Sequence, residues 1–202
     1  EYETLEELFT AKFELGTYDA LCGSRRIFSS IQEPVRGFVI DDINERWGRE
    51  EMTQWLNGKK QNSKKHITSR KATKPYAFME KNYHNPRVLA HAFTKNIKEA
   101  AIAIKEGRLE KWIRHNLGED DLALKINAIA TTATAKENEI RNSDDHVVAR
   151  ASILMDPLAP IRYKGLSFMP DAYGPTIAVE LLRRNTMQTA AEVLRYDLPN
   201  FW

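Results

Sequence analysis

The residues best suited to chemistry are a group of cations clustered between positions 59 and 74. Lysine and arginine side chains neutralise phosphates, and the serine and threonine hydroxyls interleaved with them can hydrogen-bond phosphate oxygens. Aromatic residues follow at Tyr76, Phe78 and Tyr83, where they can stack on unpaired bases. The predicted contact residues for a nucleic acid or an acidic protein surface are Lys59, Lys60, Lys64, Lys65, Arg70, Lys71, Lys74 and Arg87.

These cations belong to a strong segregation of charge along the chain. Residues 58–104 hold 11 basic and 2 acidic residues, a net charge of +9. Residues 1–57 hold 6 basic and 12 acidic residues (−6), and residues 105–202 hold 13 and 14 (−1). The near-neutral total of +2 therefore hides a basic segment. Three interpretations of it stay open: contact with a nucleic acid, contact with an acidic protein surface (including residues 1–57 of the same or a neighbouring chain), or a solvated loop without a partner.

Other kinds of reactive site are not indicated. Histidine and cysteine spacings match no zinc site, and no nucleophile-elbow, P-loop or dinucleotide motif occurs. The carboxylate groups at 41–42, 119–121 and 144–145 precede predicted helices, where the helix dipole favours negative charge. We therefore predict no metal, no cofactor and no catalytic residue. An enzyme site that forms only in three dimensions stays open, and its candidates are Asp41, Asp42, His84, His115, His146 and Arg36.

Composition favours a globular protein of the reducing cytoplasm. Apolar residues make up 42% of the chain and charged residues 29%, which is enough for a core and argues against disorder. The single cysteine, Cys22, excludes an internal disulfide and reads as a structural thiol. No apolar run reaches the roughly 18 residues of a membrane-spanning helix, so we expect no membrane contact. The acidic first residues predict no signal peptide, and because the chain does not begin with Met, a processed chain or a piece of something longer stays open.

Helix-start and helix-stop signals recur along the chain and predict a mainly α fold. Asn85-Pro86 is the strongest, because Asn caps a helix and Pro in the first helical position loses no hydrogen bond. Apolar residues follow at helical spacing, and Gly118 is predicted to end a later helix. Ser143 and Thr186 are predicted to cap two more.

Three segments are predicted to depart from this pattern. Pro34 and Gly37 predict a turn over residues 32–37. Residues 59–83 lack a sustained period and predict a long basic loop, with one short element around Tyr76–Met79. Residues 161–168 predict a small hairpin about Gly165.

The expected architecture is therefore a multi-helix bundle or an irregular helical array, with one long basic loop and one small extended element. We treat residues 1–202 as a single helical domain that can be subdivided into an acidic helical part (1–57), the basic loop (58–84) and a second helical part (85–202).

The C-terminal part adds two candidate contact features. Phe201 and Trp202 are aromatic bulk that either packs back or meets a partner. A second, smaller cationic group is formed by Arg162, Lys164, Arg183 and Arg184.

The functional hypothesis is a non-catalytic helical interaction or scaffold domain of a bacterial-type intracellular assembly, which binds an acidic protein surface or a neighbouring subunit. Two alternatives stay open. The first is a nucleic-acid-binding protein that contacts DNA or RNA phosphates through residues 59–74. The second is an enzyme whose site is not visible in the sequence.

Overall fold

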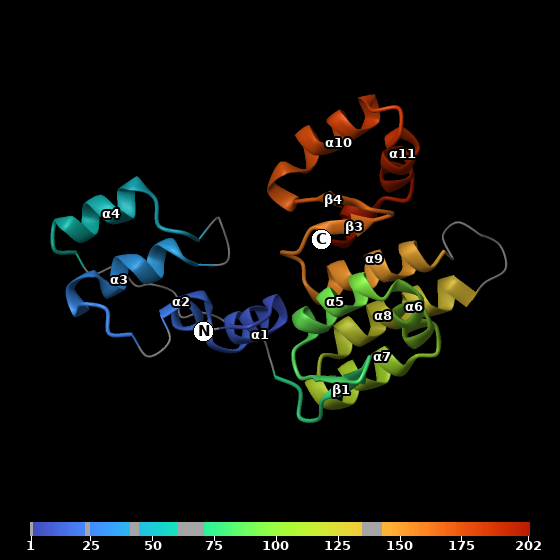
Figure 1. Cartoon of the computed structure of the whole chain (residues 1–202), viewed down its shortest axis with the longest axis horizontal. Coiled ribbons are helices and arrows are strands. Elements are labelled where there is room, and N and C mark those ends of the chain that lie inside the picture. The colour runs from blue at the N-terminus through green and yellow to red at the C-terminus, as the bar shows by residue number, and fades with distance from the viewer. Residues whose placement is uncertain (1, 23–24, 41–44, 60–70, 135–142) are drawn as a thin grey trace. The chain divides into compact units, whose positions relative to one another are not determined.

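The structure, a computed structural model, describes residues 2–22, 25–40, 45–59, 71–134 and 143–202. These residues form two compact units that divide between Lys71 and Ala72. The predicted mainly α fold is confirmed, since helices dominate both units and the strands among the described residues form two short hairpins (Figure 1).

The first unit is built from short helices. They are α1 (Leu5–Leu15), α2 (Thr17–Cys22), α3 (Ser29–Phe38) and α4 (Arg49–Leu56). The turn predicted over residues 32–37 is wrong, because Pro34 and Gly37 both lie inside α3. A proline in a helix interior removes one backbone hydrogen bond, so burial must compensate for it, and both residues are buried.

Gly37 is needed where it stands because an indole packs directly against it. A Cβ atom added at Gly37 would lie 2.3 Å from Cδ2 of Trp47, closer than any real contact. The Trp47 backbone N–H also donates to the Gly37 carbonyl at 3.1 Å. Trp47 is buried and meets Phe38 edge-on at 6.3 Å between ring centroids, so this small cluster fixes α3 to the chain that enters α4.

Among the described residues, the second unit contains both hairpins and the two longest helices. In chain order its elements are β1 (Tyr76–Phe78), β2 (Lys81–Tyr83), α5 (Pro86–Lys95), α6 (Ile97–Lys105), α7 (Arg108–Trp112), the π-helical turn η1 (Ile113–Leu117), α8 (Asp120–Thr134), α9 (Asp144–Met155), β3 (Ile161–Tyr163), β4 (Leu166–Phe168), the 3₁₀ turn η2 (Pro170–Ala172), α10 (Tyr173–Leu182), α11 (Met187–Arg195) and the 3₁₀ turn η3 (Leu198–Phe201).

The centre of this unit is α9, which is covered on all sides. It packs against α5, α6 and α8 and also contacts β3 and η3 (Figure 1). Nearly every residue from His146 to Met155 is buried, as expected for a helix with apolar side chains all round rather than on one stripe.

The sequence signals for helix ends hold at several of these elements. The Asn85 side chain accepts from the Arg87 N–H at 2.9 Å with Pro86 in the first turn of α5, and the Ser143 hydroxyl accepts from the His146 N–H at 3.4 Å. Gly118, with φ of 68°, ends the π-helical turn. Thr186 does precede α11, but its hydroxyl donates backward to the Glu180 carbonyl at 3.0 Å instead of capping the helix.

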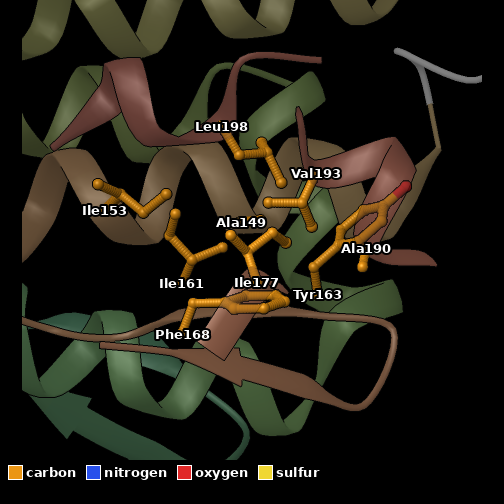
Figure 2. Close-up of a cluster of buried hydrophobic side chains, with 9 residues drawn as sticks. All are labelled: Ala149, Ile153, Ile161, Tyr163, Phe168, Ile177, Ala190, Val193 and Leu198. Atoms are coloured by element: carbon orange, nitrogen blue, oxygen red, sulfur yellow. The ribbon is translucent and has the colours of Figure 1, made fainter. Parts of the chain in front are cut away.

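One hydrophobic cluster joins the C-terminal elements to α9 (Figure 2). It combines Ala149 and Ile153 of α9 with residues from β3, β4, α10, α11 and η3, namely Ile161, Tyr163, Phe168, Ile177, Ala190, Val193 and Leu198. The hairpin predicted at residues 161–168 is confirmed, with Ile161 opposite Phe168 and Tyr163 opposite Leu166. Because side chains alternate along a strand, this register places the residues of the cluster on one face and Arg162 and Ser167 on the other.

The short element expected around Tyr76–Met79 is the first strand of the other hairpin. Tyr76 and Phe78 of β1 meet Phe93 edge-on, and Tyr76 also meets Trp112, whose indole N–H donates to the Lys74 carbonyl at 2.8 Å. The two residues that join β1 to β2, Met79 and Glu80, have φ of 48° and 62°. Two-residue turns with positive φ at both positions normally hold Asn and Gly, so this turn is strained.

We predict that Gly37→Ala destabilises the first unit selectively, because the new methyl group must displace the Trp47 ring. Overpacking of this kind costs about 1–3 kcal/mol. Hydrogen–deuterium exchange read peptide by peptide should become faster in α3 and α4 and stay unchanged in α5–α9. The matched control is Gly174→Ala in α10, where a Cβ meets nothing within 4 Å, and there exchange should stay equal or slow. Unchanged exchange in α3 of the Gly37 variant would contradict the packing described.

Replacing Met79-Glu80 by Asn-Gly should stabilise the second unit, because the new pair adopts positive φ without strain. The expected gain is about 1–2 kcal/mol in the free energy of unfolding measured with urea. The equivalent change of Lys164 alone to Asn in the other hairpin, where Gly165 already holds the second position with φ of 82°, should give a smaller gain. Equal effects at the two hairpins would show that Met79 and Glu80 are not strained.

Candidate functional site

The most exposed apolar surface of the second unit lies where α10 turns into α11. Leu182, the last residue of α10, is 88% exposed, and Met187, the first of α11, is 52% exposed. Val179 precedes Leu182 by three residues on the same helix face and is also exposed, as is Leu194 further along α11. We call Val179, Leu182, Arg183, Arg184 and Met187 the α10–α11 corner. A contiguous set of exposed large apolar residues is a feature of binding surfaces.

In the pair formed by α10 and α11, the positive side chains are exposed and the negative ones are buried or nearly so. Its three arginines, Arg183, Arg184 and Arg195, are all exposed. Its two glutamates point inward: Glu180 is 9% exposed, and the Glu192 side chain is 16% exposed. The exposed charges between Tyr173 and Tyr196 are therefore all positive, and none of the exposed residues there is a carboxylate.

Glu180 stabilises the α10–α11 corner by accepting hydrogen bonds on its buried side. Its Oε1 accepts from Arg183 Nη1 at 2.8 Å, and its backbone carbonyl accepts from the Thr186 hydroxyl at 3.0 Å. The Met187 N–H donates to the Arg183 carbonyl at 2.9 Å and so begins α11. These bonds fix the backbone of the turn, and the side chains of Leu182 and Arg184 are left to project from an ordered support.

Glu192 fixes α11 to the hairpin of β3 and β4. Its Oε2 accepts from Tyr163 Oη at 2.8 Å and from Lys164 Nζ at 2.7 Å. Burial alone would raise the pKa of Glu192, but these two hydrogen bonds outweigh it and hold the pKa below the ordinary value. Burial, together with the bond to Glu192, raises the pKa of the Tyr163 hydroxyl, which therefore keeps its proton and acts as a donor.

The basic residues predicted as contacts fall in several places. Lys60, Lys64, Lys65 and Arg70 lie outside the described residues. Lys59, Lys71 and Lys74 are described and exposed, the first two in the first unit and Lys74 at the start of the second. Their predicted contact with phosphates or an acidic protein stays a prediction.

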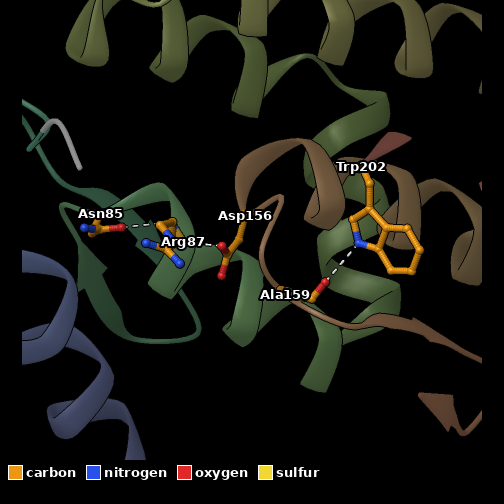
Figure 3. A network of polar contacts seen from close by, with 5 residues as sticks. All are labelled: Asn85, Arg87, Asp156, Ala159 and Trp202. Carbon is orange, nitrogen blue, oxygen red and sulfur yellow. Dashed lines mark hydrogen bonds and ion pairs between the residues drawn. The ribbon is translucent and has the colours of Figure 1, made fainter. Parts of the chain in front are cut away.

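Arg87 lies in a different setting from these lysines, inside the second unit (Figure 3). Its Nε donates to Asp156 Oδ1 at 2.8 Å, with side-chain exposures of 16% and 9%, so the pair joins the start of α5 to the end of α9. Removing one partner of a buried pair leaves an uncompensated charge, which gives Arg87 a structural role.

The two terminal aromatic residues pack back on their own chain, and Figure 3 shows the contact that Trp202 makes. The Trp202 indole N–H donates to the Ala159 carbonyl at 3.1 Å, and the ring meets Tyr173 edge-on at 5.5 Å. The Arg150 guanidinium lies 5.7 Å from the Phe201 ring. Both residues are half-buried, and both line a hollow of about 640 Å³ whose other wall is the first turn of α8.

Of the residues considered for a catalytic site, the three described histidines lie in separate places of the second unit. His84 lies against the Ala72 carbonyl at 3.2 Å, His115 is exposed in η1, and His146 is buried on α9 between Tyr163 and Tyr196. Arg36, in the first unit, lies over the Tyr18 ring and near Asp19. Asp41 and Asp42 lie outside the described residues.

The described part of the chain was compared with the requirements of a metal site and of a membrane-spanning helix. Within it, no group of three or more histidine, cysteine or acidic side chains is arranged to hold a metal ion. None of its helices is long and apolar enough to cross a bilayer.

Comparison of the chain with models of protein families, with curated proteins and with solved structures finds no match. The sequence shows the arginines and the helical spacing of Val179 and Leu182, but not that Glu180 and Glu192 turn inward, which decides the charge of the surface.

We predict that Glu192→Gln destabilises the second unit in a pH-dependent way. A carboxylate whose folded pKa is lowered stabilises the fold above its ordinary pKa of 4.5, and the contribution is lost as the pH falls through the folded value. In urea unfolding, the variant should therefore be about 1–3 kcal/mol less stable near pH 7, with the difference shrinking toward about pH 3. Glu99→Gln, an exposed change on α6, should show no such trend. An equal loss at both pH values would remove the ionic role of Glu192.

Proposed function

We propose that the chain is a non-catalytic helical interaction domain, and that the α10–α11 corner binds an acidic, amphipathic segment of a partner protein. The observation that carries this proposal is the coincidence of exposed Leu182 and Met187 with exposed Arg184 and Arg195 on a helical pair whose carboxylates are turned inward.

The apolar part of this surface supplies affinity. A leucine that is 88% exposed in the free protein gains about 25 cal/mol for each Å² that a partner removes from water. The ordered turn beneath it strengthens the effect, because side chains on a fixed backbone lose less conformational entropy when they are covered. The partner must therefore present apolar side chains of its own at this position.

The charged part supplies orientation. Arg183 is already paired with Glu180, whereas Arg184 has no hydrogen bond or ion pair within the described part of the chain. Guanidinium groups bind carboxylates through parallel hydrogen bonds, so aspartate or glutamate beside the partner's apolar stripe complements the corner. A segment with both properties is an amphipathic helix with one acidic face.

The test uses a labelled peptide of about 18 residues with leucines on one helical face and glutamates on the other. Fluorescence anisotropy should show binding to the full chain that weakens with salt but persists, because the apolar contact is not screened. Leu182→Gln should weaken binding about tenfold, equivalent to about 1.4 kcal/mol, and Arg184→Glu by a similar factor.

Matched controls use exposed positions elsewhere in the same unit. Leu124→Gln on α8, where leucine is 56% exposed, and Lys98→Glu on α6 should leave peptide binding unchanged. A peptide with lysine in place of glutamate should bind more weakly. Binding of duplex DNA, single-stranded RNA or anionic vesicles that is tighter than peptide binding and equally sensitive to Leu182→Gln and Arg184→Glu would overturn the proposal. Equal effects of the corner and control variants would also overturn it.

A further inference from the structure

A second hollow lies beneath the hairpin of β3 and β4, away from the α10–α11 corner. Its volume is about 390 Å³, within the range of small-molecule sites. Three segments far apart in the sequence form it: the α5–α6 junction, the first turns of α9 and the hairpin itself. We call it the hairpin hollow.

The charges lining the hairpin hollow are opposite and separate. Asp145 contributes a carboxylate from α9, and Arg162 contributes a guanidinium from β3. Neither has a hydrogen bond or ion pair within the part of the chain that the structure describes. The third charged residue, Lys164, is held by Glu192 at 2.7 Å, so its charge is balanced by its own chain.

The two charged residues lie on different elements, Arg162 on strand β3 of the hairpin and Asp145 on helix α9. Arg162 is opposite Ser167 on the hairpin face that points away from the hydrophobic cluster, while its neighbour Tyr163 is buried in that cluster (Figure 2). The Glu192 bonds to Tyr163 and Lys164 hold this strand in place. Asp145 lies in the N-terminal turn of the buried helix α9. Both Asp145 and Arg162 are therefore part of regular secondary structure.

The helices contribute Ile97, Val148 and Thr94 to the lining, whereas Leu166 belongs with Tyr163 to the hairpin face that packs on the hydrophobic cluster. An apolar wall beside one carboxylate and one guanidinium matches a ligand with three parts: an ammonium group, a carboxylate and an apolar side chain. We infer that the hairpin hollow binds a free apolar α-amino acid, with its ammonium group at Asp145, its carboxylate at Arg162 and its side chain against Ile97 and Val148.

The two unpaired charges decide against simpler ligands. A simple anion would meet Arg162 but would be repelled by Asp145, and a simple cation would face the reverse. An uncharged apolar molecule would pair with neither charge, so it would bind more weakly than a ligand that pairs with both. A zwitterion satisfies both groups at once, and the guanidinium–carboxylate contact is the stronger because it can be bidentate.

The test is isothermal titration of the full chain with L-leucine and three analogues of the same side chain. N-acetyl-L-leucinamide lacks both charges, 4-methylpentanoate keeps only the carboxylate, and isopentylamine keeps only the ammonium group. We expect saturable binding of leucine, with each analogue at least about tenfold weaker, a ratio that corresponds to the loss of one charged contact.

Two variants assign the charges. Asp145→Asn should reduce leucine binding to the level of 4-methylpentanoate, and Arg162→Gln should reduce it to the level of isopentylamine. Asp171→Asn and Arg108→Gln, at exposed positions that do not line the hollow, serve as controls and should leave binding unchanged. Thermal unfolding of each variant without ligand checks that the fold is intact.

Three outcomes would overturn the inference. One is the absence of leucine binding at about 10 mM, a concentration that saturates even a weak site. Another is equal binding of leucine and N-acetyl-L-leucinamide, which would show that the ammonium and carboxylate groups of the ligand do not contribute to binding. The third is leucine binding that the Asp145 and Arg162 variants leave unaltered while both stay folded, which would place the ligand elsewhere.

Discussion

The burial of α9 is the constraint on which the second unit depends. The helix is enclosed along its length, and charged residues of other elements are joined to it at its two ends. At the C-terminal end, Asp156 receives Arg87 from the start of α5. At the N-terminal end, Lys105 of α6 reaches Asp144 at 2.7 Å. The two ion pairs fix the outer helices to the ends of the central one, while apolar contacts fill its length.

This arrangement leaves the C-terminal elements as a separate layer on one side of α9. The layer has its own apolar cluster, which includes only Ala149 and Ile153 from the central helix. Glu180 forms hydrogen bonds beneath the turn between α10 and α11, and Glu192 joins α11 to the hairpin. Because both carboxylates are used inside the layer, they add no negative charge to its surface. The same bonds that stabilise the layer therefore determine what its surface presents to other molecules.

Local signals in the sequence were sufficient for several helix ends and for the second hairpin. Asn85 and Ser143 cap through their own side chains, and that chemistry needs no tertiary context. Pro34 shows where such reasoning stops, because proline and glycine nearby predict a turn from propensity alone, yet Trp47 comes from further along the chain to pack on Gly37 and keeps the segment helical.

The candidate sites could not be predicted from the sequence, because they too depend on contacts between residues that are far apart in the chain. The hairpin hollow combines residues 94 and 97 with Asp145 and the strand at 162, and no periodicity links positions that far apart. The cationic group at Arg162, Lys164, Arg183 and Arg184 was visible as a group, but its members have different partners. Lys164 and Arg183 are paired with glutamates of α11 and α10, so only the other two are available for contacts outside the chain.

The interior position of α9 also sets an order of events during synthesis. The apolar faces of α5, α6 and α8 are made first, and each of them is covered by a helix that the ribosome has yet to produce. They cannot form a closed core until residue 155 has emerged, and the layer beyond α9 cannot assemble before that. A nascent chain arrested in the segment between α8 and α9 would therefore expose the apolar faces of three helices, and such a chain is a natural substrate for chaperones.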